Sequence, residues 1–149
     1  MVDEDTLFAM VERCVADAVL ALENETRLPP FAKLLAGDGS VRDIACGDAD
    51  EKACYETLLQ RLRAEAKMGD IDAVALCARV TIPTHYDPSA PQGIRIHLEE
   101  KARAGQKIAA KLLYVPYELF VAEDGGKRSV MLHHPIAVGI PMEVYTETV

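Results

Sequence analysis

The stretch IDAVALCARVTI, residues 71–82, decides the fold of this chain. Successive side chains of a β-strand point to opposite faces, and in this stretch both faces are largely apolar. One face carries Val74, Leu76, Ala78, Val80 and Ile82, and the other carries Ala73, Ala75 and Cys77. Such a strand belongs in the middle of a sheet, with a covering layer on each side. The small side chains of the second face predict that a large element lies close to it.

Upstream of this strand, the sequence predicts a helix, a hairpin and a second helix. The apolar residues of the first helix recur at the spacing of one helix face: Leu7, Phe8, Val11, Val15, Ala18, Val19 and Leu22. Two short apolar runs on either side of residues 37–39, Gly-Asp-Gly, predict the hairpin. The second helix has Asp48 as its expected N-cap, followed by Glu51, and Gly69 as its expected stop.

Downstream of the strand, the sequence predicts further hairpins. After a proline-rich loop, residues 94–100 and 107–115 form one pair of strands, and an apolar run at residues 130–145 is broken by Pro135 and Pro141. We therefore predict an α+β fold: an antiparallel sheet of five to six strands with two long helices, in the order α-β-β-α-β-β-β with one further strand optional. No composition break divides the 149 residues, so we expect a single domain, 1–149.

The charge balance restricts the class of partner. The chain has 24 acidic and 16 basic residues, a formal net charge of −8, and this argues against binding to nucleic acid. A basic protein partner remains open. No segment approaches the run of about 18 apolar residues that spans a membrane, and the first residues, MVDEDTLFAM, are acidic where a signal peptide is basic. We expect a cytoplasmic protein that does not bind membranes.

The four cysteines are expected to be thiols in that reducing compartment. Cys14 lies within the apolar pattern of the first helix and Cys77 within the decisive strand, so both are predicted to be core residues. Cys46 and Cys54 stand on either side of a polar turn, which leaves redox or metal chemistry open.

The stretch RIHLEE, residues 95–100, holds the best candidates for a catalytic site. Alternation places Arg95, His97 and Glu99 on one face of a strand, opposite the apolar Ile94, Ile96 and Leu98. We predict that the polar face is simply solvent-exposed, as it is in many antiparallel strands. The alternative is an acid–base site that combines His97 and Glu99 with a residue of the proline-rich loop, either His85 or Asp87.

Metal and cofactor signatures are missing from the sequence. The HExxH, EF-hand and paired CxxC motifs are absent, as are the P-loop and the G-x-G-x-x-G loop, so we expect no metal and no cofactor. A metal site assembled from His85, Asp87, His97 and His133 stays open, although their spacing does not call for one.

Two hypotheses for the function follow. Two helices cannot cover both faces of a sheet of five to six strands, so we expect a second copy to cover the rest, most simply in a two-fold homodimer. The leading hypothesis is a non-enzymatic binding or regulatory module that acts as a homo-oligomer. The alternative is a small enzyme that uses His97 and Glu99.

Overall fold

The computed structural model describes residues 3–25, 28–46, 50–104, 106–123 and 125–145. These residues form two long helices, two single-turn 3-10 helices and seven strands, which confirms the predicted α+β fold. In chain order they are α1 (Glu4–Glu25), β1 (Phe31–Ala36), β2 (Val41–Ala45), α2 (Glu51–Lys67), β3 (Ile71–Thr81), η1 (Thr84–Tyr86), β4 (Gln92–Glu100), η2 (Lys101–Arg103), β5 (Ala110–Val121), β6 (Arg128–Leu132) and β7 (Ile136–Ile140). Neither helix is long and apolar enough to cross a membrane.

The strands form one antiparallel sheet in the order β2-β1-β3-β4-β5-β6, with β7 also paired to β5. The first half of β5 pairs with β7 and the second half pairs with β6. Pro135 lies between β6 and β7, and proline interrupts a ladder because it has no N–H to donate. The C-terminal apolar run is therefore divided into two strands, which explains why seven strands are present where five to six were expected.

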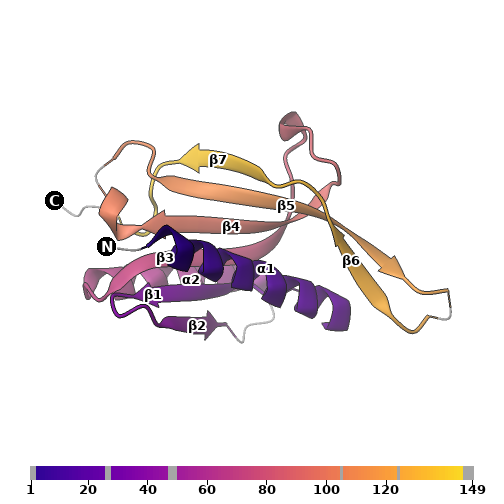
Figure 1. Ribbon diagram of the computed structural model, residues 1–149, viewed down its shortest axis with the longest axis horizontal. Coiled ribbons are helices and arrows are strands. Elements are labelled where there is room, and N and C mark those ends of the chain that lie inside the picture. The colour runs from indigo at the N-terminus through magenta and orange to yellow at the C-terminus, as the bar shows by residue number, and fades with distance from the viewer. Residues whose placement is uncertain (1–2, 26–27, 47–49, 105, 124, 146–149) are drawn as a thin grey trace.

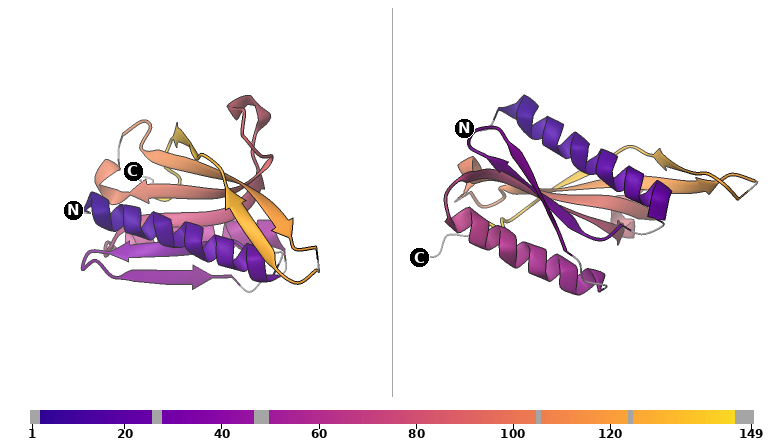
Figure 2. Two further views of the ribbon diagram at one scale, coloured as in Figure 1. Left: turned by 45° about the vertical axis from the view of Figure 1, so that its right-hand side comes forward. Right: turned by 90° about the horizontal axis from the view of Figure 1, so that it is seen from below.

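Strand β3 lies in the middle of the sheet, between β1 and β4, as its sequence predicts. The two helices lie on opposite sides of the sheet, and the right-hand view of Figure 2 shows all three layers. On the α1 side, the small side chains of Ala73, Ala75 and Cys77 belong to one core with Cys14. The predicted large element is therefore α1. On the α2 side, the partners of β3 include Leu58 and Leu62.

The N-cap of helix α2 lies two residues later than the sequence suggested, at Asp50 and not at Asp48. The side chain of Asp50 accepts a hydrogen bond from the main-chain N–H of Lys52 at 3.0 Å and forms the N-cap. The prediction of Asp48 as the cap is wrong on this account, and Asp48 itself lies outside the described residues. The stop at Gly69 is confirmed, because its φ of +89° is the left-handed conformation that glycine adopts without strain.

Helix α1 is tied to the sheet by a buried lysine. Lys33 of β1 is only 1% exposed, and its ammonium donates to Asp17 of α1 and to Asp43 of β2, both at 2.7 Å. Burial opposes the charged form of this amine, but the two carboxylates outweigh burial and raise the pKa of Lys33. Local sequence patterns do not indicate this link. It holds α1 against β1, and the helix also contacts β3, β4 and β6.

Part of the sheet extends beyond the helices. In Figure 1 the hairpin of β5 and β6 projects to one side, past the end of α1. We call the paired segments 117–121 and 128–132, with the turn between them, the arm. Its exposed large apolar side chains are Leu119, Phe120, Val121, Met131 and Leu132.

Candidate functional site

The predicted exposure of the polar face of RIHLEE was wrong. His97 is 1% exposed and Glu99 is fully buried, while Arg95 is half-buried. Ile94 and Ile96 lie in the core as predicted. Both faces of β4 are covered, because the chain after β7 folds back over the face that carries His97 and Glu99. Alternation correctly placed the side chains on two faces, but it does not reveal what covers each face.

The covering segment, residues 142–145, is held by the carboxylate of Glu99, and we call it the strap. Glu99 accepts hydrogen bonds from the main-chain N–H groups of Glu143, Val144 and Tyr145 at 2.8–3.1 Å. Val144 and Tyr145 join the core on the α2 side. This segment is a further layer that covers part of the sheet, and it comes from the same chain. The prediction from the sequence counted only the two helices as covering layers.

The imidazole of His97 completes the surroundings of this carboxylate. Its Nε2 hydrogen-bonds to Glu99, and because an ionised carboxylate only accepts, the imidazole is the donor. Burial raises the pKa of Glu99, but the hydrogen bonds from His97 and from the main chain outweigh burial, and the net shift is downward. The pair thus belongs to a buried hydrogen-bond network around an ionised carboxylate.

The other candidates do not join this pair. His85 and Asp87 are exposed residues at and after η1, where His85 packs against the ring of Tyr86 at 4.1 Å between centroids. Asp87 has a φ of 51° and ends the 3-10 turn. Among the residues that the structure describes, no group of three or more His, Cys, Asp or Glu side chains is placed to hold a metal ion. The assembled metal site with His133 is therefore not formed.

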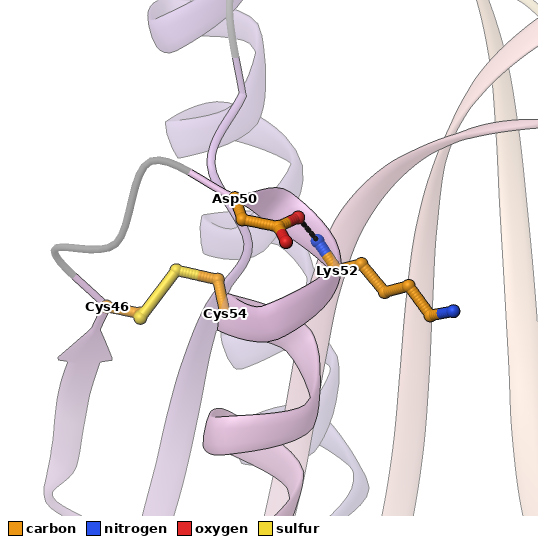
Figure 3. Close-up of a disulfide and its surroundings, with 4 residues drawn as sticks. All are labelled: Cys46, Asp50, Lys52 and Cys54. Atoms are coloured by element: carbon orange, nitrogen blue, oxygen red, sulfur yellow. Dashed lines mark hydrogen bonds between the residues drawn. A yellow bond between two sulfur atoms is a disulfide. The ribbon is translucent and has the colours of Figure 1, made fainter.

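Two of the four cysteines are joined, contrary to the prediction that all are thiols. Figure 3 shows the disulfide between Cys46, just after β2, and Cys54 in α2, beside the cap formed by Asp50 and Lys52. Their Cα atoms are 5.6 Å apart, a normal spacing for a disulfide. The spacing of these two cysteines across a polar turn was the available signal. Disulfide formation depends on how the turn folds, which the spacing does not determine.

The remaining cysteines are core residues, as predicted. Cys14 and Cys77 are free, fully buried thiols on the α1 side. Burial raises the pKa of Cys14 to about 12 and that of Cys77 well above its usual value. Neither thiol is therefore activated at neutral pH.

One concave surface lies beside α1, where parts of β5 and β7 are not covered by the helix. Two adjoining hollows, of about 580 Å³ and 440 Å³, share the side chains of Phe8, Val11 and Leu113. We call them together the groove. Helix α1 forms one wall and the α1-facing side of β5 forms the floor, with Leu132 and Pro135 at the end nearest the arm. Phe8 and Leu20 on the helix wall are 64% and 60% exposed, although both are large and apolar.

Both the groove and the arm carry charges of both signs: Arg103 and Lys111 line the second hollow, and the arm includes Glu118. The helix wall of the groove bears the carboxylates of Glu4, Asp5, Glu12 and Glu23. The arm bears Lys127 and Arg128, and the guanidinium of Arg128 donates to the main-chain carbonyl of Glu23 at 3.0 Å. Phe8, Val11 and Val15 were identified from the sequence as one apolar helix face. Helical spacing alone did not show that this face is wider than the area that the sheet covers.

Comparison of the chain with protein-family models, with curated proteins and with solved structures yields no match, so the assignment of function rests on this geometry.

Proposed function

We propose that this protein is a non-enzymatic binding or regulatory module that acts as a homodimer through the groove and the arm. The observation that carries the proposal is the exposure of large apolar side chains on both elements, above all Phe8 at 64%, Leu20 at 60% and Met131 at 51%. Large contiguous apolar patches are rare on soluble monomers and mark interaction surfaces. The functional unit proposed is the dimer.

A second copy suits this surface because the groove and the arm of one chain both expose large apolar side chains. The groove offers an apolar floor beneath an acidic helix wall, with Arg103 and Lys111 also lining it, and the arm offers apolar side chains beside Lys127. In a two-fold arrangement, each arm meets the groove of the other copy, so every contact occurs twice. A helix-to-helix dimer is less favourable, because it brings two acidic α1 surfaces together.

The alternative of a small enzyme has less support. A general base must reach the proton that it removes from a substrate. His97 and Glu99 are 1% and 0% exposed, and the carboxylate is already surrounded by donors from the strap and the imidazole. An enzyme would need a different constellation or release of the strap.

The proposed compartment is the cytosol, and the Cys46–Cys54 disulfide supplies its test. Cytosolic disulfides are kept reduced by the glutathione and thioredoxin systems. Protein whose thiols are alkylated at the moment of lysis should therefore show all four cysteines labelled after denaturation. Recovery of an intact Cys46–Cys54 bond would place the protein in an oxidising compartment instead.

The dimer is tested by light scattering over a wide dilution range. We expect twice the 16.3 kDa of one chain at high concentration. Phe8→Glu puts a charge into the groove and should give the monomer mass with an unchanged circular dichroism spectrum. Met68→Glu is the matched control, because Met68 is 77% exposed at the end of α2, on the other side of the sheet, and this variant should remain dimeric.

Two results would contradict the proposal. One is a soluble wild-type protein with the monomer mass at every concentration. That result would favour a basic protein, and not a second copy, as the partner of the acidic groove wall. The other is a dimer that Phe8→Glu leaves intact, which would place the interface elsewhere.

A further inference from the structure

A smaller hollow, separate from the groove, lies on the α2 side of the sheet. It has a volume of about 290 Å³ and is enclosed by the first half of α2, the end of β3 and the middle of β4. Its walls include Pro30, Tyr55, Ala78, Val80 and Arg95. The remaining side chains around it are charged: Glu51, Lys52, Glu56 and Arg79.

The Nε of Arg95 has no hydrogen-bond acceptor among the described residues, whereas several other arginines have a defined partner. Arg42 pairs with Glu65 at 2.8 Å, Arg103 pairs with Glu100 at 2.9 Å and Arg128 donates to a carbonyl. The guanidinium of Arg95 lies over the ring of Tyr55, 5.0 Å from its centroid, and its buried Nε has no hydrogen-bond partner within the described part of the chain. A buried donor of this kind normally has an acceptor, so the missing acceptor requires an explanation.

We propose that this hollow binds a small organic carboxylate. One face of the guanidinium is occupied by Tyr55, so an acceptor must approach along the edge of the guanidinium plane. That approach suits a carboxylate, whose two oxygens match the parallel N–H groups of arginine. The apolar walls at Pro30, Ala78 and Val80 then contact the hydrocarbon part of the ligand.

The size and the apolar walls of the site narrow the ligand class. A hollow of about 290 Å³ lies at the small end of ligand pockets, so the acid carries only a short or single-ring hydrocarbon group. The charges around the hollow have both signs, since Glu51 and Glu56 lie beside Lys52 and Arg79, so they do not select the charge of the ligand. The apolar walls do discriminate, because they contact the hydrocarbon group of an organic carboxylate and find no such group on a phosphate.

The inference is independent of the proposed dimer. The hollow lies on the α2 side, while the groove lies on the α1 side, so binding can be measured whether or not the chain self-associates.

The experiment is a titration of ¹⁵N-labelled full-length protein with sodium acetate, butyrate and benzoate, followed by amide chemical shifts. Sodium chloride and sodium phosphate serve as the comparison anions. We expect saturable shifts with butyrate or benzoate in the millimolar range, concentrated around Tyr55, Ala78 and Arg95. Chloride should produce only small, linear changes, and phosphate should bind more weakly than the carboxylates.

Three variants identify the group responsible. Arg95→Gln removes the charge and the paired donors, and it should weaken binding by about tenfold or more, since hydrogen bonds between charged groups have this size. Arg95→Lys keeps the charge without the two parallel donors, so it should weaken binding less than Arg95→Gln does. Arg42→Gln removes the same charge from an arginine that is already paired with Glu65 and should change affinity less than about twofold.

The outcomes that overturn the proposal are specific. If no carboxylate produces saturable shifts in the wild type, the hollow is not a carboxylate site. Phosphate binding more tightly than every carboxylate would assign a different anion. If Arg95→Gln and Arg42→Gln weaken carboxylate binding equally, the effect is one of net charge and the proposal is wrong. If Arg95→Gln does not fold, the affinity of Arg95→Lys is compared with that of Arg42→Gln instead.

Discussion

Tyr145 donates its main-chain N–H to the carboxylate of Glu99 at 3.0 Å, although the two residues are 46 positions apart in the chain. The phenol of Tyr145 donates in turn to the carbonyl of Ile71 at 2.8 Å. One residue of the strap therefore links the end of β4 to the start of β3. The buried carboxylate organises the chain around it, and this arrangement can be tested directly.

Removing the charge of Glu99 should release the strap. Glu99→Gln leaves a single acceptor and places an amide NH₂ against main-chain donors, so we expect the free energy of unfolding in urea to fall by about 2–4 kcal/mol. Glu118→Gln, at a position 46% exposed on β5, should change it by less than about 0.5 kcal/mol. Equal effects of the two substitutions would show that the hydrogen bonds to Glu99 contribute little.

Acid should have the same effect as that substitution. The folded pKa of Glu99 lies below its ordinary value of 4.5, so the folded state holds this proton more weakly than the unfolded chain does. The stabilisation is therefore fully present above the unfolded pKa and is lost as the pH falls through the folded pKa. Hydrogen exchange at the amides of Glu143, Val144 and Tyr145 should lose protection over that acidic range in the wild type. Unchanged relative protection of these amides there would contradict the assignment.

Substituting the buried lysine should cost less stability than substituting its two carboxylate partners. Lys33→Met removes the buried charge and leaves Asp17 and Asp43, which are 48% and 67% exposed, free to be hydrated, so the loss should stay below about 1.5 kcal/mol. Asp17→Asn combined with Asp43→Asn leaves an unpaired ammonium under α1 and should destabilise by about 3–5 kcal/mol. Chemical denaturation of both variants measures the two losses of stability. A larger loss in Lys33→Met than in the double asparagine variant would mean that Lys33 reaches water.

The centre of the sheet should not tolerate charge. Leu76 of β3 is fully buried against α2, and an uncompensated carboxylate there costs several kcal/mol, comparable with the whole stability of a domain. We expect Leu76→Asp to abolish the cooperative thermal transition. Val41→Asp is the control on the outer strand β2, where Val41 is 40% exposed, and it should still unfold cooperatively.

The elements could be predicted from the sequence where their signal is local. The two faces of β3, the helix spacing from Leu7 onward and the stop at Gly69 depend on neighbours within a few positions, and all three are confirmed. The surroundings of His97 could not be predicted in this way, because they depend on a strap more than 40 residues later in the chain. The sequence pattern placed His97 on a solvent-exposed face, where truncation to alanine costs little; its burial instead predicts that His97→Ala clearly lowers the free energy of unfolding.

The cysteines divide into two classes that labelling can separate. Cys14 and Cys77 are buried thiols with raised pKa, so native protein should react with iodoacetamide only as fast as it unfolds. In purified protein in which the Cys46–Cys54 disulfide has formed, these two cysteines should become reactive only after dithiothreitol, and reduction should lower the free energy of unfolding by about 2–3 kcal/mol, because the closed loop is short. Mass spectrometry of intact protein counts the labels. Rapid labelling of Cys14 in native protein without reductant would show that Cys14 is not a buried core residue.

The attachment of the arm has a consequence for local stability. Its hydrogen bonds to α1 converge on Glu23, whose carbonyl accepts from Arg128 and whose carboxylate accepts from the main-chain N–H of Val130 at 3.0 Å. A projecting hairpin with few buried contacts opens at a lower free energy than the central strands of the sheet do. The amides of the arm should therefore exchange faster than those of β3, and slower exchange of the arm amides on binding would show that the bound partner contacts the arm.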